Sequence, residues 1–321
     1  MHKIIPASIL LIMMISIPYK LKAQEMNTEH EARLLLDAKA ILGEGAIWNH
    51  KEQAFWWVDI ENGLLNIYNP LTGENKSYEM GQRIGTVVPA TDGTAVVALE
   101  DGIYSYDFGS GELVFRSRPG KHTGSIRFND GKCDPAGRLW AGTMGMGGNI
   151  RHKAYLYRFD HDFTAQTMLD SITISNGICW SADKKKMYYI DTPSMEVKEY
   201  DYNNETGAIT FSRVAVEIPQ GMGGPDGMCI DAEGRLWVAL YGGSAVCCFD
   251  PASGALLQKI KVPAPNVTSC AFTGRDLNTL YITTASQGMN QEARERYPYA
   301  GGLFYIELDT RGTEASFFKA D

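Results

Sequence analysis

A short pattern that recurs six times limits this chain more than any other feature of its sequence. Each copy has an apolar segment, a turn and a second apolar or aromatic segment, as in Asn129-Asp-Gly-Lys-Cys-Asp-Pro-Ala-Gly-Arg-Leu-Trp-Ala. Gly137 in that copy stands where a tight hairpin loop requires a positive φ. Successive copies begin 41–50 residues apart. Their first residues are Glu44, Gly85, Asn129, Asn176, Asp226 and Thr268.

A second turn lies between successive copies, as in Tyr68-Asn-Pro-Leu-Thr-Gly73 and Phe249-Asp-Pro-Ala-Ser-Gly254. Each unit therefore holds two hairpins, or four strands, which is the pattern of a β-propeller blade. We predict an all-β chain that forms a six-bladed β-propeller with four antiparallel strands per blade. Residues 32–39 precede the first copy and read as a strand. We expect this strand to pair with the last blade, because closing the ring protects its edges.

The first 23 residues read as a segment separate from the propeller. Lys3 precedes an uncharged, mostly apolar run over residues 4–17, and Ala23 offers a small residue for cleavage. This pattern predicts a secretory signal peptide at residues 1–23, followed by a single propeller domain over residues 24–321. An uncleaved anchor is the alternative, although the run is short for a membrane span. We expect a periplasmic or secreted protein with no membrane segment after cleavage.

Charge and cysteine usage exclude several classes of function. The chain carries a formal net charge of −8, and such an acidic surface is a poor partner for nucleic acid but attracts cations. Four of the six cysteines occupy matching strand positions of the repeat, which favours buried free thiols over a disulfide framework or a zinc motif. These four are Cys133, Cys179, Cys229 and Cys270.

The first residue of each copy is predicted to face the central channel, because the first strand of a propeller blade lines that channel. Equivalent positions then form a ring of two carboxylates, two carboxamides, one hydroxyl and one glycine. We call Glu44, Gly85, Asn129, Asn176, Asp226 and Thr268 the axial ring. Crowded carboxylates favour a cation between them, and these oxygen donors suit Ca²⁺, Mg²⁺ or Mn²⁺. The alternative is a polar, water-filled channel mouth in which Asn and Asp side chains cap strand ends.

The same residues carry a family resemblance, with five motifs in order. They are Leu42-Gly-Glu-Gly, Arg127-Phe-Asn-Asp-Gly-Lys, Ala141-Gly-Thr-Met, Ser175-Asn-Gly and Pro225-Asp-Gly-Met-Cys-Ile-Asp-Ala-Glu-Gly-Arg-Leu-Trp. Over residues 44–304 the chain resembles the regucalcin/gluconolactonase family, also called senescence marker proteins. The resemblance implies a six-bladed propeller that hydrolyses sugar lactones with one divalent metal ion. Ca²⁺ is the expected ion, and Mg²⁺, Mn²⁺ or Zn²⁺ are alternatives.

The resemblance also implies roles for individual residues. The metal ligands of the family correspond to Glu44, Asn176 and Asp226, and its substrate contacts correspond to Arg127 and Asn129. Asp226 would then be the catalytic residue, as general base or water activator, with the metal as a Lewis acid. The alternative for Arg127 is a structural partner of an axial carboxylate. The axial ring inferred from the repeat contains all three implied ligands.

One position departs from the family pattern and leaves the substrate open. Some members have a substrate-contacting Glu after the Gly-Thr-Met motif, where this chain has Gly147. Asn149, Arg151 or His152 are alternative contacts, and the other interpretation of these residues is an exposed polar loop. We expect a small-molecule sugar lactone as the substrate. Another metal-dependent hydrolase, of the phosphotriesterase or fluorophosphatase kind, and a non-catalytic sugar- or calcium-binding propeller are the alternative functions.

Overall fold

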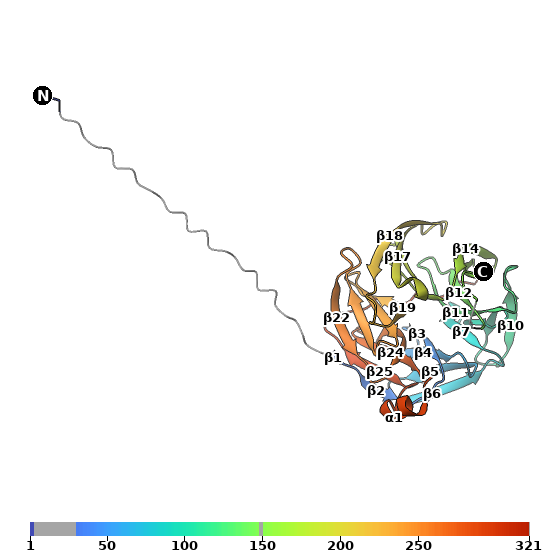
Figure 1. Ribbon diagram of the computed structural model, residues 1–321. Helices are drawn as coiled ribbons and strands as arrows, with labels where there is room; N and C mark the ends of the chain where they lie inside the picture. The colour runs from blue at the N-terminus through green and yellow to red at the C-terminus, as the bar shows by residue number, and fades with distance from the viewer. Residues whose placement is uncertain (3–29, 148–149, 321) are drawn as a thin grey trace.

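The computed structural model describes residues 1–2, 30–147 and 150–320, and most of residues 30–320 form mainly antiparallel sheets arranged around a central axis (Figure 1). The prediction of a signal peptide falls almost wholly outside the described residues. Within the described part, no helix is long and apolar enough to cross a membrane. The helical segments found there are short: α1 (Gln291–Arg296) and the 3-10 turn η1 (Thr192–Ser194).

Four sheets each consist of four consecutive antiparallel strands. The first sheet contains β3 (Gly43–Asn49), β4 (Ala54–Asp59), β5 (Leu64–Asn69) and β6 (Glu74–Glu79). The second contains β7 (Ile84–Pro89), β8 (Ala95–Leu99), β9 (Ile103–Tyr106) and β10 (Leu113–Ser117). The third contains β11 (Ile126–Cys133), β12 (Leu139–Gly145), β13 (Ala154–Phe159) and β14 (Ala165–Ile172). The fourth contains β15 (Ser175–Trp180), β16 (Lys186–Asp191), β17 (Glu196–Tyr202) and β18 (Ile209–Glu217).

The remaining strands form one nine-stranded sheet whose two halves meet at a single residue pair, Tyr241 with Asn266. One half contains β1 (His30–Glu31), β19 (Gly224–Ile230), β20 (Leu236–Tyr241), β21 (Ala245–Phe249) and β22 (Leu256–Lys261). The other contains β2 (Arg33–Leu36), β23 (Asn266–Thr273), β24 (Thr279–Ala285) and β25 (Leu303–Glu307). The innermost strands β3, β7, β11, β15, β19 and β23 contact one another in a closed cycle. A propeller of four-stranded antiparallel blades is thus confirmed. The count of six stays a prediction, which this cycle supports.

The ring is closed by the strand that precedes the first repeat. In β2, Arg33 pairs with Tyr305 and Leu34 pairs with Phe304 of β25, so the N-terminal strand becomes the outer strand of the last blade. The pairing predicted for residues 32–39 is therefore confirmed. It supplies hydrogen-bond partners to a strand that would otherwise be an open edge.

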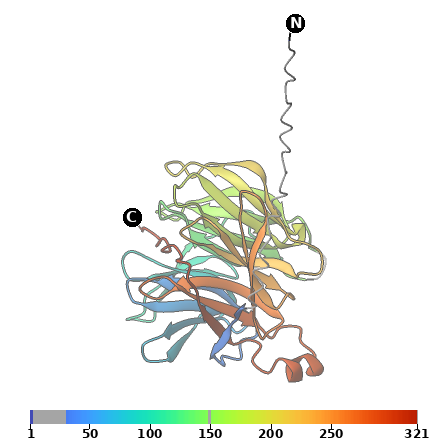
Figure 2. The ribbon, with the colours of Figure 1, turned by 90° about the vertical axis from the view of Figure 1, so that its left-hand side faces the viewer.

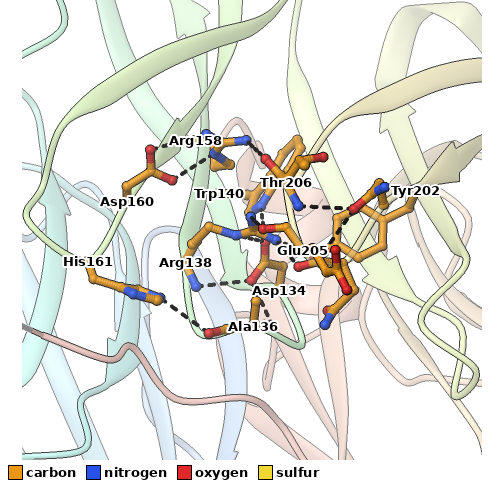
Figure 3. Close-up of polar contacts among 12 residues, drawn as sticks. Asp134, Ala136, Arg138, Trp140, Arg158, Asp160, His161, Tyr202, Glu205 and Thr206 are labelled. Carbon is orange, nitrogen blue, oxygen red and sulfur yellow. Dashed lines mark hydrogen bonds and ion pairs between the residues drawn. The ribbon is translucent and has the colours of Figure 1, made fainter.

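Polar clasps between blades explain one recurring part of the repeat (Figure 3). The carboxylate of Asp134 accepts hydrogen bonds from Arg138 Nε at 2.7 Å and from Trp140 Nε1 at 2.9 Å. Arg138 Nη2 in turn donates to Tyr202 Oη of the next blade at 2.8 Å and to the Asn204 carbonyl at 2.9 Å. The Asp-x-x-Gly-Arg-Leu-Trp motif therefore shapes its own hairpin and fastens it to a neighbour.

The C-terminal residues 311–319, here called the C-terminal strap, cross one face of the propeller, opposite the face that carries α1 (Figure 2). Isolated bridges join Gly312 to Asp231, Ser316 to Cys133 and Phe318 to Ala90. The strap thus ties together three blades that are far apart in the sequence.

Candidate active site

The axial ring coincides with an irregularity that every innermost strand shares. Each one shifts its register against the second strand of its blade at the ring position. The shifts fall between Glu44 and Ile47, Ile84 and Thr86, Phe128 and Gly131, Asn176 and Ile178, Pro225 and Met228, and Val267 and Ser269. Such β-bulges re-aim side chains and are frequent next to active sites. The six predicted positions are therefore structurally equivalent.

A glycine follows each of the three predicted metal ligands, and close approach between blades explains at least two of these glycines. A Cβ on Gly177 would lie 2.6 Å from the carbonyl oxygen of Asp226 on the next blade. A Cβ on Gly227 would lie 2.8 Å from the carbonyl oxygen of Thr268. Gly45 has a φ of 64°, a conformation that favours glycine. The glycines therefore let the innermost strands meet closely at the level of the ring.

A chain of hydrogen bonds orients the two carboxamides of the ring. Arg127 Nη1 donates to Asn129 Oδ1 at 2.8 Å, and Asn129 Nδ2 donates to Asn176 Oδ1 at 2.9 Å. Asn176 Nδ2 then donates to Thr192 Oγ1 at 2.7 Å. All but Thr192 are buried, with at most 6% of their surface exposed. The structure thus brings together three residues that were predicted from different blades or from the resemblance.

The two axial carboxyl groups, Glu44 and Asp226, lie close enough to alter each other's protonation. Burial, and next the charge of Asp130, raise the pKa of Glu44 to about 8. Burial, and next the charge of Glu44, raise the pKa of Asp226 well above its usual range. Glu44 Oε2 accepts from the Gly45 amide at 2.9 Å, whereas Asp226 Oδ1 is buried without a hydrogen-bond partner among the described residues.

Asp130 is a member of the site that the repeat did not predict. Its side chain is buried, Oδ1 accepts from the Gly131 amide at 2.7 Å, and Oδ2 has no partner within the described part of the chain. Neighbouring residues of a regular strand face opposite sides, so choosing Asn129 for the channel excluded Asp130. The bulge between Phe128 and Gly131 removes that restriction. The sequence signal was the acidic residue beside Asn129 in the Asn-Asp-Gly segment.

These contacts fit a hard divalent cation. Three buried carboxyl groups all have raised pKa values, with burial as the main cause, and two of their oxygens lack partners. A cation among them would relieve both their desolvation and their mutual repulsion. No cluster of three or more His, Cys, Asp or Glu in the described residues is suited to hold a metal by itself. Carboxamide oxygens of the ring would therefore have to join Glu44 and Asp226 as ligands.

The predicted substrate side of the ring is less complete. Arg127 is buried and donates to the Phe128 carbonyl at 2.9 Å as well as to Asn129, and it forms no ion pair with the described carboxylates. Its remaining donors are therefore available to a ligand. Gly147 has a φ of 118°, and Asn149 lies outside the described residues. Arg151 and His152 are exposed.

The chain was compared with known proteins. Residues 42–286 match the family described as SMP-30/Gluconolactonase/LRE-like region. A Bacillus subtilis (strain 168) protein named as a sugar lactone lactonase, YvrE, is 40% identical over 291 residues, which cover 91% of this chain and 99% of that protein. Regucalcin of Danio rerio is 36% identical over 275 residues, or 85% and 92% of the two chains. A crystal structure described as a calcium-binding protein, regucalcin, from Agrobacterium tumefaciens superposes with a TM-score of 0.85 at 26% identity, covering 90% and 97%. The motifs, the propeller and these matches agree, and the chain belongs to the SMP-30/gluconolactonase/LRE-like family.

Proposed function

We propose that this protein hydrolyses sugar lactones at the axial ring with one divalent cation, Ca²⁺ being the first candidate and Mg²⁺, Mn²⁺ and Zn²⁺ the others. The observation that carries the proposal is the unpartnered, buried oxygen of Asp226 beside Glu44 in a ring of hard oxygen donors. The family and its relatives named as lactonases support the class of reaction.

The residues of the site divide into three roles. Glu44, Asn176 and Asp226 would hold the cation, which when bound supplies electrophilic stabilisation of negative charge on the carbonyl oxygen. Arg127 and Asn129 bind the hydroxyl groups or the ring oxygen of the sugar. Asp226, as general base or water activator, accepts a proton from the attacking water and returns it to the leaving ring oxygen. Water adds to the carbonyl carbon, the ring C–O bond breaks, and the product is an open hydroxy acid.

The role of Asp226 is tested by Asp226→Asn, which keeps the shape of the side chain but removes its basicity. We expect kcat/KM for an aldonolactone to fall about 100-fold or more, as is typical for the loss of a general base. Asp309→Asn, at an exposed position, serves as the matched control and should leave the rate unchanged. Full lactone turnover by Asp226→Asn would refute the proposed role.

The substrate class and the metal are tested together by a panel of aldonolactones crossed with Ca²⁺, Mg²⁺, Mn²⁺ and Zn²⁺ after chelation. We expect no turnover in chelator and recovery with at least one ion. Faster hydrolysis of phosphotriesters than of every lactone would favour the phosphotriesterase alternative. No turnover of either substrate class with any ion would leave the non-catalytic binding propeller as the better explanation.

Export is a further part of the proposal, and it rests on the sequence of residues 1–23. Expression of the full chain in a Gram-negative host should give a periplasmic protein that begins at or near Gln24. Recovery of the intact chain from the cytoplasm or the membrane, checked by mass spectrometry, would contradict the prediction of a cleaved signal peptide.

A further inference from the structure

A cavity of about 270 Å³ lies on the propeller axis at the end of the channel away from the axial ring. Its walls come from five of the innermost strands, at positions two to four residues beyond the ring position of each strand. They are residues 46–48, 132–133, 179–180, 229–230 and 271–272. At a rise of about 3.3 Å per residue, the cavity lies roughly 10 Å further along the channel. No residue of the axial ring lines it.

The C-terminal strap forms the outer wall of this cavity, through residues 313–316. The strap is anchored on both sides, because the Gly312 amide donates to the Leu277 carbonyl at 2.7 Å and the Phe318 amide donates to the Pro89 carbonyl at 2.9 Å. These two hydrogen bonds therefore hold the outer wall of the cavity in place.

The walls of the cavity are mainly apolar. Ile47, Ile230 and Phe272 contribute apolar side chains, and Trp48 and Trp180 contribute indoles. The two indoles are buried, at 2% and 7% exposure, and their Nε1 atoms are sealed from the cavity, so the indoles present carbon atoms to it. A ligand that fits these walls therefore needs an apolar body.

Lys132 adds a positive charge at the boundary between the cavity and the axial ring. Its ammonium donates to the Met228 carbonyl and makes no ion pair within the described part of the chain. Lys132 follows Asn129 of the ring by three residues and Met228 follows Asp226 by two, so the ammonium lies near the ring as well. An ammonium has three hydrogens to donate, and two remain for other acceptors. The acid at the rim, Glu314, is mostly exposed and lies 4.0 Å from His50.

We propose that this cavity binds a small organic carboxylate with an apolar, planar body. The ring of such a ligand packs against the apolar walls, and its carboxylate accepts hydrogen bonds from the Lys132 ammonium. The ligand class follows from the chemistry of the walls, since they are mainly apolar and the charged group at their inner end, Lys132, is positive. The size also agrees, because an apolar cavity of about 150 Å³ holds one benzene ring. This site is separate from the lactone site and needs no metal.

Calorimetric titration of the full chain in chelator tests the proposal, with 3-phenylpropionate as the probe. We expect one site with a dissociation constant of about 1 mM or tighter. The neutral 3-phenylpropionamide has the same body and should bind about tenfold more weakly or worse. Gluconate has the same charge on a hydroxylated body and should not bind. No binding of 3-phenylpropionate, equal affinity for the amide, or a preference for gluconate would each overturn the proposal.

Three substitutions locate the binding. Ala182→Trp fills the cavity at an exposed lining position and should abolish binding without changing lactone hydrolysis. Trp180→Phe keeps an aromatic wall and removes only a donor that is sealed from the cavity, and should leave the affinity unchanged. Lys132→Met should weaken 3-phenylpropionate about tenfold or more and leave the amide unchanged. Unaltered affinity in Ala182→Trp would show that the probe binds elsewhere and would refute the assignment.

Discussion

Glu44→Gln offers a direct measure of the electrostatic strain in the axial ring. The pKa of Glu44 rises from an ordinary value of 4.5 to about 8 in the fold, first because the carboxyl is buried and second because of Asp130. A group whose pKa is raised on folding binds its proton more tightly in the folded state. Metal-free stability must therefore fall as pH rises from about 4.5 to about 8, and it is highest below that window.

The size of the effect follows from the same two pKa values. Each unit corresponds to about 1.4 kcal/mol, so full ionisation of Glu44 lowers the free energy of unfolding by about 5 kcal/mol. At pH 7 the loss is about 3 kcal/mol. A glutamine is never ionised, and its amide can donate to the unpartnered oxygen of Asp226. Glu44→Gln should therefore be more stable than the parent by up to about 3 kcal/mol at pH 7 and nearly equal to it at pH 4.5.

The assay is urea unfolding in chelator between pH 4.5 and pH 8, with Glu112→Gln as an exposed control that changes charge but not the ring. Excess Ca²⁺ or Mn²⁺ should reverse the order, because the parent, with two axial carboxylates, gains more from the ion than the variant with one. A parent protein whose metal-free stability is flat or rises over this pH range would refute the reasoning. So would a Glu44→Gln variant that shows no gain at pH 7.

Three further predictions concern other parts of the molecule. In urea unfolding, Asp134→Asn should lower the free energy of unfolding by about 3 kcal/mol, and Asp231→Asn should lower it by about half as much. The difference is expected because the arginine partner of Asp134 is 7% exposed, whereas that of Asp231 is 31% exposed. Arg127→Met should lower kcat/KM for lactones about 10- to 100-fold while calorimetry shows unchanged metal affinity; weakened metal binding would point to a structural role instead. Gly177→Ala should lower the free energy of unfolding by about 1–3 kcal/mol and weaken metal binding, because the added Cβ displaces the backbone of Asp226. An unfolding free energy and a metal affinity equal to those of the parent would contradict the close approach of the blades.

Much of this architecture could be predicted because the fold is repetitive. One hairpin pattern, found six times, defines the strands, and equivalence between copies places Glu44, Asn129, Asn176 and Asp226 on one axis without any knowledge of long-range contacts. The strand at residues 32–39 was predictable for a related reason, since an unclosed propeller leaves one blade a strand short. Within the site, the residues at equivalent positions of the six repeat copies could be predicted as a group.

The rest depends on departures from regularity, which a repeat does not record. Asp130 enters the site because β11 bulges, and no alternation rule places two neighbouring side chains on one side of a strand. The C-terminal strap has no counterpart in other units, so its path could not be read from the repeat. The cavity behind it arises from side-chain volumes of five strands and the strap together. The shape of this cavity is therefore determined only once the blades and the C-terminal strap are assembled.

The way the ring closes has a consequence for how the chain reaches its native state. Four of the sheets are built from consecutive strands, so their contacts are local and can form early. The pairing of β2 with β25 instead joins residues about 270 positions apart, so we expect β2 to dock only after the last blade has formed. Until then β25 presents an open edge that invites pairing with other chains. Refolding of this protein should accordingly end in a slow, aggregation-sensitive step, and light scattering during refolding should increase when residues 30–36 are deleted.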